Sequence, residues 1–314
     1  MEASQSAVRA PSGSVLGGAR RRPGEDTVKV FLILCTLLSV LTTVGILIAL
    51  LEETIAFFGD IPVGEFFTGT EWFPLFADPS YGVLPLVWGT LQITLIALIV
   101  AMPLGLGAAI YLSEYARPRV RKTFKPILEV LAGIPTIVFG YFALTFFTPE
   151  VLQGLFGRDS IKGFNSLSAG IVMGFMVLPT IASLAEDAMT AVPQSLREGA
   201  FGLGASKLQV SMRVVFPAAL SGIVAAVVLG ISRAIGETMI VVVAAGAIPS
   251  MSAAPGEPHA TMTAFIANTA KGDVPTGSIG YETIFAVGAT LFFMTLLMNM
   301  IAIRFVRRYR QVYE

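Results

Sequence analysis

Long apolar runs dominate this chain, and polar residues gather in the stretches between them. Because about 20 mostly apolar residues are needed to cross the hydrocarbon layer, five of the runs predict membrane-spanning helices. A sixth region is longer than one span needs, and its last part, 239–248, is too short to cross separately. We therefore expect an all-α polytopic membrane protein with six transmembrane helices. The predicted spans are 28–51, 85–112, 127–148, 167–185, 214–248 and 282–303.

Helix breakers lie inside three of these spans, at 103–107, 133–135 and 178–180. In lipid such residues are tolerated where neighbouring helices or a watery cavity satisfy the backbone groups that they free. Kinking and close packing are the simplest explanation for each site. Taken together, the three sites favour a bundle that forms a conduit over a set of isolated anchors.

The distribution of basic residues predicts the orientation, because short cytoplasmic loops are enriched in Lys and Arg. Of the 21 Lys and Arg residues, only Arg158, Lys162 and Lys271 fall in one set of loops, and Arg233 falls within a span. All the others fall in the opposite set. We therefore expect both termini in the cytoplasm, in the inner membrane of a prokaryote.

These spans define four segments. We expect a disordered cytoplasmic tail over 1–27, a first span and outer loop over 28–81, a transport domain over 82–308, and a cytoplasmic end at 309–314. The aromatic residues of the outer loop 52–84 predict an interfacial belt. The later outer loop, 249–281, has a middle part, 261–270, that predicts a short helix.

Composition agrees with a bilayer location: 54% of the residues are hydrophobic, 13% are charged, and the mean hydropathy is +0.77. A soluble domain has about 25% charged residues. Acidic and basic residues are equal in number, at 21 each, which gives no reason to expect a nucleic-acid partner. The single Cys35 and the single His259 predict neither a disulfide nor a metal site. We expect His259 to be a solvated loop residue.

The polar stretch 186–213, between the fourth and fifth spans, predicts a short amphipathic helix on the inner side. Ser195 and Glu198 have the spacing of a capping box. Two readings fit this pattern: a helix seated in a groove of a partner protein, or a loop resting on lipid headgroups. The expected apolar face consists of Ala200, Phe201, Leu203, Leu208 and Val210.

This stretch resembles the EAA loop of importer permeases of the ATP-binding-cassette (ABC) class. The matching positions are Glu198, Gly199, Ala200, Gly204, Val214, Phe216 and Pro217. The chain departs from the family pattern at Gly199, where the family has Ala, at Val214, where it has Ile, and at Phe216, where it has Leu. The resemblance implies that the loop is the coupling helix, seated in a cleft of the ATPase. The implied coupling residues are Glu198, Gly199, Ala200, Gly204 and Pro217.

The chain has no GxxxxGK[ST] phosphate-binding loop, and no Gly is followed by Lys anywhere in it. Such a loop is what cradles the phosphates of ATP. We therefore expect no catalytic residues here. ATP and magnesium would be bound by a separate ATPase.

Two charged residues, Arg233 and Glu237, fall within the fifth predicted span. Their i, i+4 spacing predicts that they pair on one helix face. Charges in a span are costly and usually face protein or water. The pair therefore has two readings: an anion contact on the translocation path, with Glu237 holding Arg233, or a self-neutralising structural bridge.

The chain from about 82 to 308 is also similar to the permease subunits of phosphate importers, most of all to the PstC type. The similarity lies in 84–91, 103–105, 133–140, 178–179 and 233–238, and in the aromatic segment 67–74. It implies the type I ABC importer fold, alternating access, and uptake of inorganic phosphate. The implied partners are a second permease of the PstA type, an ATPase dimer of the PstB type and an outer phosphate-binding protein of the PstS type.

Other functions remain open on the residues alone. A sulfate or molybdate importer permease shares the EAA loop, and Arg233 by itself does not specify one anion. An ATP-independent carrier is disfavoured by the loop pattern and by the lack of an evident inverted repeat. A membrane scaffold is disfavoured by the broken spans and the charged residues within one of them.

Overall fold

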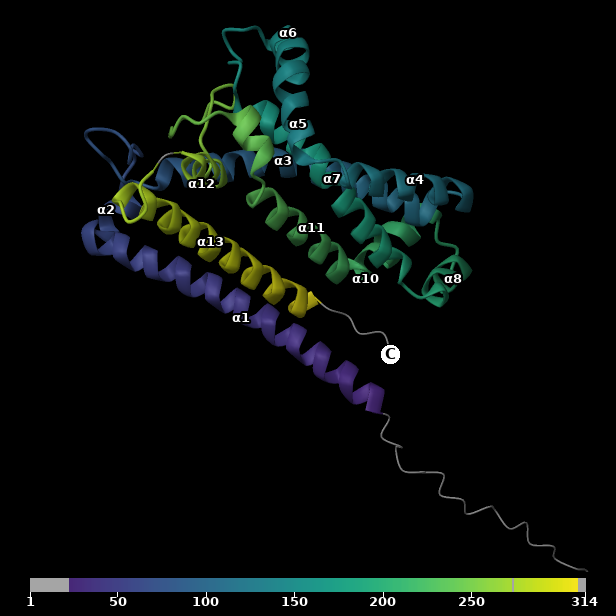
Figure 1. Ribbon diagram of the computed structural model, residues 1–314. Coiled ribbons are helices and arrows are strands. Elements are labelled where there is room, and N and C mark those ends of the chain that lie inside the picture. Colours follow the sequence, from purple (N-terminus) through teal and green to yellow (C-terminus); the bar gives the residue numbers. More distant parts are fainter. Residues whose placement is uncertain (1–22, 273, 310–314) are drawn as a thin grey trace, which may run out of the picture. The chain divides into compact units, whose positions relative to one another are not determined.

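The computed structural model describes residues 23–272 and 274–309, and these are mostly helical (Figure 1). Within these described residues, four helices are long and apolar enough to span a bilayer: α1 (Pro23–Asp60), α3 (Leu84–Ile110), α7 (Ser166–Thr190) and α13 (Ile279–Tyr309). Most of the predicted N-terminal tail and the last five residues lie outside the described residues.

Two bent helix pairs bring the possible number of spans to six, by length and composition. The first joins α4 (Pro118–Ala132) to α5 (Thr136–Phe142), the π-helical segment η2 (Ala143–Leu152) and α6 (Gln153–Phe156), with a bend of 85°. The second joins α9 (Lys207–Val210), η3 (Ser211–Val215) and α10 (Phe216–Ala218) to α11 (Leu220–Ile235), with a bend of 72°.

The shorter elements complete the chain. They are α2 (Val63–Thr68), the π-helical turn η1 (Tyr111–Tyr115) that extends α3, α8 (Gln194–Gly202), the π-helical turn η4 (Val241–Ala245) and α12 (Met262–Lys271). The predicted helix at 261–270 is therefore confirmed as α12. The chain divides into two compact units, one ending at Ala49 and the other beginning at Leu50. The helix packing and the site both belong to the second unit.

The three predicted helix breaks have different outcomes. Pro103 lies inside α3 and Pro179 inside α7, and both helices continue through them. Only 133–135 ends a helix: Gly133 closes α4 and Pro135 precedes α5. Proline disfavours the helical conformation in the residue before it, and the C-cap of α4, Gly133, lies two residues before Pro135. Pro179 is buried within α7, whereas Pro103 is exposed on α3.

Helices α3 and α7 pack extensively against each other and form the central pair of the second unit, and α11 packs against α7 and α13. Glycines permit the close approach of α3 and α7. A Cβ at Gly174 would meet the Ala97 carbonyl oxygen at 2.8 Å and the Val100 Cβ at 2.8 Å, and a Cβ at Gly170 would meet Ile96 at 2.7 Å. Small residues at such positions let backbones pack directly, which is the main source of helix association in lipid.

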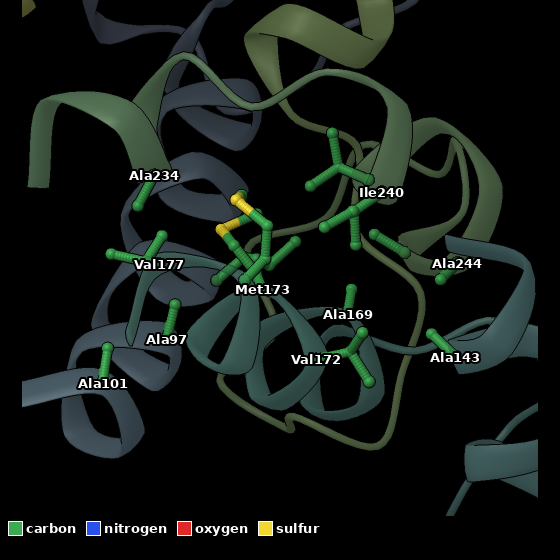
Figure 2. Close-up of a cluster of buried hydrophobic side chains, with 14 of the residues drawn as sticks. Ala97, Ala101, Ala143, Ala169, Val172, Met173, Val177, Ala234, Ile240 and Ala244 are labelled. Carbon is green, nitrogen blue, oxygen red and sulfur yellow. The ribbon is translucent and has the colours of Figure 1, made fainter. Parts of the chain in front are cut away.

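Small side chains also build the central core (Figure 2). Ala97 and Ala101 of α3 belong to this cluster together with Ala169, Met173 and Val177 of α7. Ala143 of η2, Ala234 of α11 and Ile240 with Ala244 near η4 close it from other sides. The core therefore joins both bent helix pairs to the α3–α7 pair.

Three aromatic residues at 52–84 belong to a second core, so the prediction of an interfacial belt is wrong for Phe57, Phe66 and Trp72, whereas Phe67 and Phe73 are exposed. Phe57 and Phe66 are fully buried and meet edge-to-face, with ring centroids 5.5 Å apart. Trp72 packs edge-on against Phe265 of α12 at 5.0 Å. Edge-to-face pairs of this kind stabilise beyond the area that they bury.

The prediction that His259 is solvated is also wrong, because its side chain is fully buried. Its Nε2 lies 2.8 Å from the Ser252 carbonyl oxygen, which only accepts, so Nε2 carries a proton. Its Nδ1 lies 2.8 Å from the Ser166 hydroxyl at the start of α7. His259 thus ties the loop after η4 to α7. Ser166 lies 93 residues before His259 in the sequence, and no pattern in the sequence links the two residues.

Candidate functional site

The loop between α7 and α11 folds as two short helices, α8 and α9, with a turn between them (Figure 1). Glu198 and Gly199 on α8 are exposed, whereas Ala200 is partly buried. Beside them Phe201, Leu203 and Leu208 are also exposed, and Leu203 is 91% exposed. We call Glu198, Gly199, Phe201, Leu203 and Leu208 the α8 surface. Exposed apolar side chains gathered beside a charge are typical of an interaction site.

Gly204 has φ of +80°, a conformation that residues with a side chain rarely adopt. Its amide donates to the Phe201 carbonyl, and the Ala205 amide donates to the Ala200 carbonyl. These two bonds stop the helix and turn the chain toward α9, as glycine commonly does just after a helix. The position six residues after Glu198 therefore requires glycine for the backbone, and this turn places Leu203 outward.

The predicted capping box at Ser195 and Glu198 is wrong. Helix α8 begins after Pro193, and no side chain caps it. A capping box does form one helix later: the Ser206 hydroxyl accepts from the Gln209 amide, and the Gln209 side chain accepts from the Ser206 amide at 2.8 Å. The spacing rule identified the right motif at the wrong place, because Pro193 occupies the N-cap position and Ser195 already lies inside the helix.

An apolar base holds the two short helices against the ends of α3 and α7. Val210, predicted to share the apolar face of α8, is buried instead in this base, with Met189 and Val192. Leu196 and Ala200 of α8 pack on the same cluster. The predicted apolar face is therefore divided, with one part turned inward and the other forming the α8 surface. Pro217 lies in α10, at the bend that leads into α11.

Arg197, next to Glu198, points the other way and joins three parts of the chain. Its guanidinium donates to the Glu114 carboxylate at 3.1 Å, to the Met189 carbonyl at 2.8 Å, and to the Val192 carbonyl. The two charged side chains are only 11% and 7% exposed. Charge-assisted bonds shielded from water in this way are among the stronger polar contacts in proteins. They fasten α8 to the ends of α3 and α7.

A second buried carboxylate, Glu186, holds α4 against α7. Its side chain is 1% exposed and pairs with Arg121 and with Lys125, the latter at 3.0 Å. Thr190, one turn later, donates its hydroxyl to Glu186 at 3.2 Å. Lys125 also pairs with the exposed Asp187. Helix α4 has no buried residue of its own, so these ionic contacts are its principal attachment to α7.

Arg233 and Glu237 do not pair, so the predicted contact on one helix face is wrong. Helix α11 ends at Ile235, and Glu237 therefore lies beyond it. The Glu237 carboxylate accepts from the amides of Met239 and Ile240, at 3.0 and 3.3 Å, and opens the next helical turn. Arg233 donates to the Thr180 hydroxyl of α7 at 3.0 Å. Gly236 supplies the helix end that the i, i+4 argument overlooked.

No group of three or more potential metal ligands occurs among the residues that the structure describes.

A family model described as "binding-protein-dependent transport system inner membrane component" matches residues 101–311. The chain belongs to this family. It is a membrane-embedded transport component of an ABC system rather than an enzyme.

Curated relatives of the permease cover most of its length. The probable ABC transporter permease protein YqgH of Bacillus subtilis is 35% identical over 281 residues, 88% of this chain and 89% of that protein. The phosphate transport system permease protein PstC 1 of Mycobacterium tuberculosis is 38% identical over 279 residues, 78% of this chain and 82% of that protein. PstC of Haemophilus influenzae is 32% identical over 261 residues, 78% of this chain and 80% of that protein.

Solved structures agree with the fold of the permease. A bacterial ABC transporter that imports the polysaccharide alginate matches with a TM-score of 0.62 at 15% identity, over 93% of this chain and 100% of that one. The inward-facing MetNI methionine ABC transporter matches with a TM-score of 0.54 at 19% identity, over 73% of this chain and 95% of that one. At these identities the likeness concerns the fold alone.

Arg197, Glu114 and Glu186 are residues of the site that sequence reasoning missed. Glu114 and Glu186 follow predicted apolar runs and Arg197 lies in the polar stretch 186–213, and at such positions charge is ordinarily explained by solvent exposure. A signal was present in Arg197, which directly precedes Glu198: neighbours on a helix are about 100° apart and face different surroundings.

Proposed function

We propose that this chain is the permease subunit of an ATP-driven importer of inorganic phosphate. The observation that carries the proposal is the 38% identity to PstC 1 of Mycobacterium tuberculosis over 78% of the chain. Other proteins named PstC, from Xylella fastidiosa and Mesorhizobium japonicum, are 33% identical over 76% of it. The sulfate and molybdate alternatives have no comparable support.

The proposed assembly contains a second permease of the PstA type, two ATPase subunits of the PstB type and an outer binding protein of the PstS type. ATP and magnesium would be bound by the ATPase subunits, because this chain has no phosphate-binding loop. All six predicted spans cross the inner membrane in this proposal, with both termini and the α8–α9 loop in the cytoplasm. The basic residues around that loop support this orientation.

The α8 surface is the proposed coupling contact with the ATPase. Glu198 and Leu203 project outward, while Arg197 and Val210 fix the loop to the membrane helices. Closing of the ATPase subunits on ATP would displace α8 and shift the equilibrium between outward- and inward-open states. A loaded binding protein that prefers one of these states would couple phosphate delivery to that shift.

Arg233 is the proposed contact for the anion. Its guanidinium carries a fork of five N–H donors that suits phosphate oxygens. It is partly buried and makes no ion pair within the described part of the chain, so its charge is available to an anion. Glu237 has a different proposed part: it holds the backbone that follows α11.

The function is tested by coexpressing the chain with its three partners and reconstituting the purified complex in vesicles. We expect ATP-dependent uptake of radiolabelled phosphate that excess unlabelled sulfate and molybdate do not reduce. Preferential uptake of sulfate or molybdate would overturn the assignment of the cargo. Uptake by the purified chain alone, without ATP, would overturn the assignment to a powered importer.

The coupling contact is tested in the same vesicles with Glu198→Gln and Gly204→Ala. The alanine must adopt a left-handed conformation that costs about 1–2 kcal/mol, so the turn shifts and Leu203 moves with it. We expect both variants to retain less ATPase on purification and to transport more slowly, with normal membrane insertion. Ser195→Ala, an exposed change on the same helix, is the matched control. Normal ATPase retention and uptake in both variants would contradict the coupling contact.

A further inference from the structure

Arg197 and Glu198 are neighbours on α8 but lie in opposite environments. Glu198 belongs to the exposed α8 surface, whereas the Arg197 side chain is 11% exposed. A residue that is so enclosed has little surface to offer a docking protein. Its guanidinium instead donates hydrogen bonds within this chain, to Glu114, Met189 and Val192.

The partners of Arg197 belong to two different membrane helices. Glu114 lies in η1, the π-helical extension of α3, and its side chain is 7% exposed. Met189 is in the last turn of α7, and Val192 follows that helix. One guanidinium therefore connects the short helix to the inner ends of both members of the central α3–α7 pair.

The geometry requires arginine at this position. The Nη2 atom serves the Glu114 carboxylate and the Met189 carbonyl, while Nη1 serves the Val192 carbonyl. A planar guanidinium holds several donors in a fixed fork, and a lysine ammonium does not. Both charges are removed from water, so each depends on the other for compensation.

A second contact joins η1 to α9, the short helix that follows α8. The Lys207 ammonium of α9 lies over the Tyr115 ring of η1, 5.0 Å from its centroid. Cation–π contacts of this geometry are attractive. The turn η1 is thus held at Glu114 by α8 and at Tyr115 by α9.

We propose that Arg197 is a positioning residue that transmits displacement of α8 to α3 through Glu114. The proposal rests on the proposed function, because it assumes that an ATPase moves α8. Without the Arg197–Glu114 link the ATPase still docks on the α8 surface, but the loop yields and the central helices no longer follow it. ATP is then consumed with less phosphate moved for each molecule.

The test uses the reconstituted complex with four single variants. Arg197→Gln removes the charge and the fork, Arg197→Lys keeps only the charge, and Glu114→Gln removes the opposite charge at nearly constant volume. Arg213→Gln is the matched control, because Arg213 is an exposed arginine of the same loop. For each variant, the amount of copurified ATPase, the hydrolysis rate with loaded binding protein, and the phosphate transported per ATP are measured.

We expect the copurified ATPase to stay unchanged in all four variants. Phosphate transported per ATP should fall about fivefold or more in Arg197→Gln, since residues that carry coupling alter it by this order. Arg197→Lys and Glu114→Gln should fall between that variant and the wild type. Arg213→Gln should behave like the wild type.

Two results would overturn the inference. One is an unchanged ratio of phosphate to ATP in both Arg197→Gln and Glu114→Gln. The other is a loss of copurified ATPase in proportion to the loss of uptake, which would make Arg197 a residue for folding or docking. Failure of the proposed function is distinguishable, because the wild-type complex itself would then show no ATP-dependent phosphate uptake.

Discussion

At the scale of single residues, Arg233 and Glu237 show that an i, i+4 spacing brings two side chains together only when no helix end lies between them. Gly236 separates them, so the carboxylate serves the next backbone segment and the guanidinium turns to Thr180 on α7. Arg233 is thereby placed against the central helix pair. An anion on its way through the bundle would meet a cation that no carboxylate of the described chain neutralises.

We predict that Arg233→Gln lowers phosphate uptake about 10- to 100-fold, the effect of losing one hydrogen bond to a charged group. Assembly with the partner subunits should remain normal. Uptake by reconstituted vesicles and gel filtration of the complex measure the two properties. Thr180→Val is the companion variant: it removes only the neutral partner of Arg233 and should have a smaller effect. Unchanged uptake in Arg233→Gln would remove Arg233 from the path.

At the scale of helices, the pairing of α3 with α7 depends on glycines that face the neighbouring backbone. Gly174 is buried against Ala97 and Val100, whereas a Cβ at Gly107 would have no neighbour within 4 Å. Gly174 therefore has no room for a methyl group, whereas Gly107 has. The structure distinguishes these two helix glycines, and the sequence does not.

We predict that Gly174→Ala destabilises the protein by about 1–3 kcal/mol, because the methyl group overpacks the α3–α7 contact. Gly107→Ala should be neutral or stabilise it by about 0.5–1 kcal/mol, since alanine favours the helix and meets nothing. The unfolding midpoint of the detergent-solubilised protein measures both. Equal destabilisation by the two substitutions would contradict this account of the contact.

The apolar runs themselves predicted the long helices well. The predicted spans 85–112, 167–185 and 282–303 correspond to α3, α7 and α13, because long runs of apolar residues leave little choice to a backbone in lipid. Helix breakers predicted an interruption at 133–135, but hydropathy carries no information about direction, so neither the 85° bend there nor the 72° bend near Pro217 was predicted. The burial of the Arg197 and Glu186 side chains was also not predicted, because it depends on contacts with residues far away in sequence.

At the scale of the whole molecule, the orientation in the membrane decides whether the α8–α9 loop lies on the same side as the proposed ATPase. Lys122 of α4 and Lys162 before α7 are both exposed lysines, and the proposed topology places them on opposite sides. They form a matched pair for measuring which side each segment faces.

We predict that a membrane-impermeant maleimide labels Lys162→Cys in intact cells and Lys122→Cys only after the membrane is opened. The measurement needs a Cys35→Ser background, since Cys35 is the single native thiol. Basic residues favour the cytoplasmic side, and Lys122 lies in the more basic segment. Labelling of Lys122→Cys in intact cells would reverse the orientation and remove the loop from any cytoplasmic ATPase.

The left-handed turn at Gly204 has a consequence for the cell as well as for the transporter. The turn holds Leu203 91% exposed beside Phe201 and Leu208. Every newly made copy therefore has an exposed apolar patch until another protein covers it. In the proposed assembly, a subunit without its ATPase would be open to aggregation or proteolytic removal through the residues of its coupling contact. Supply of the ATPase would in this way limit how much of this chain survives, and the ratio of subunits would be corrected after synthesis.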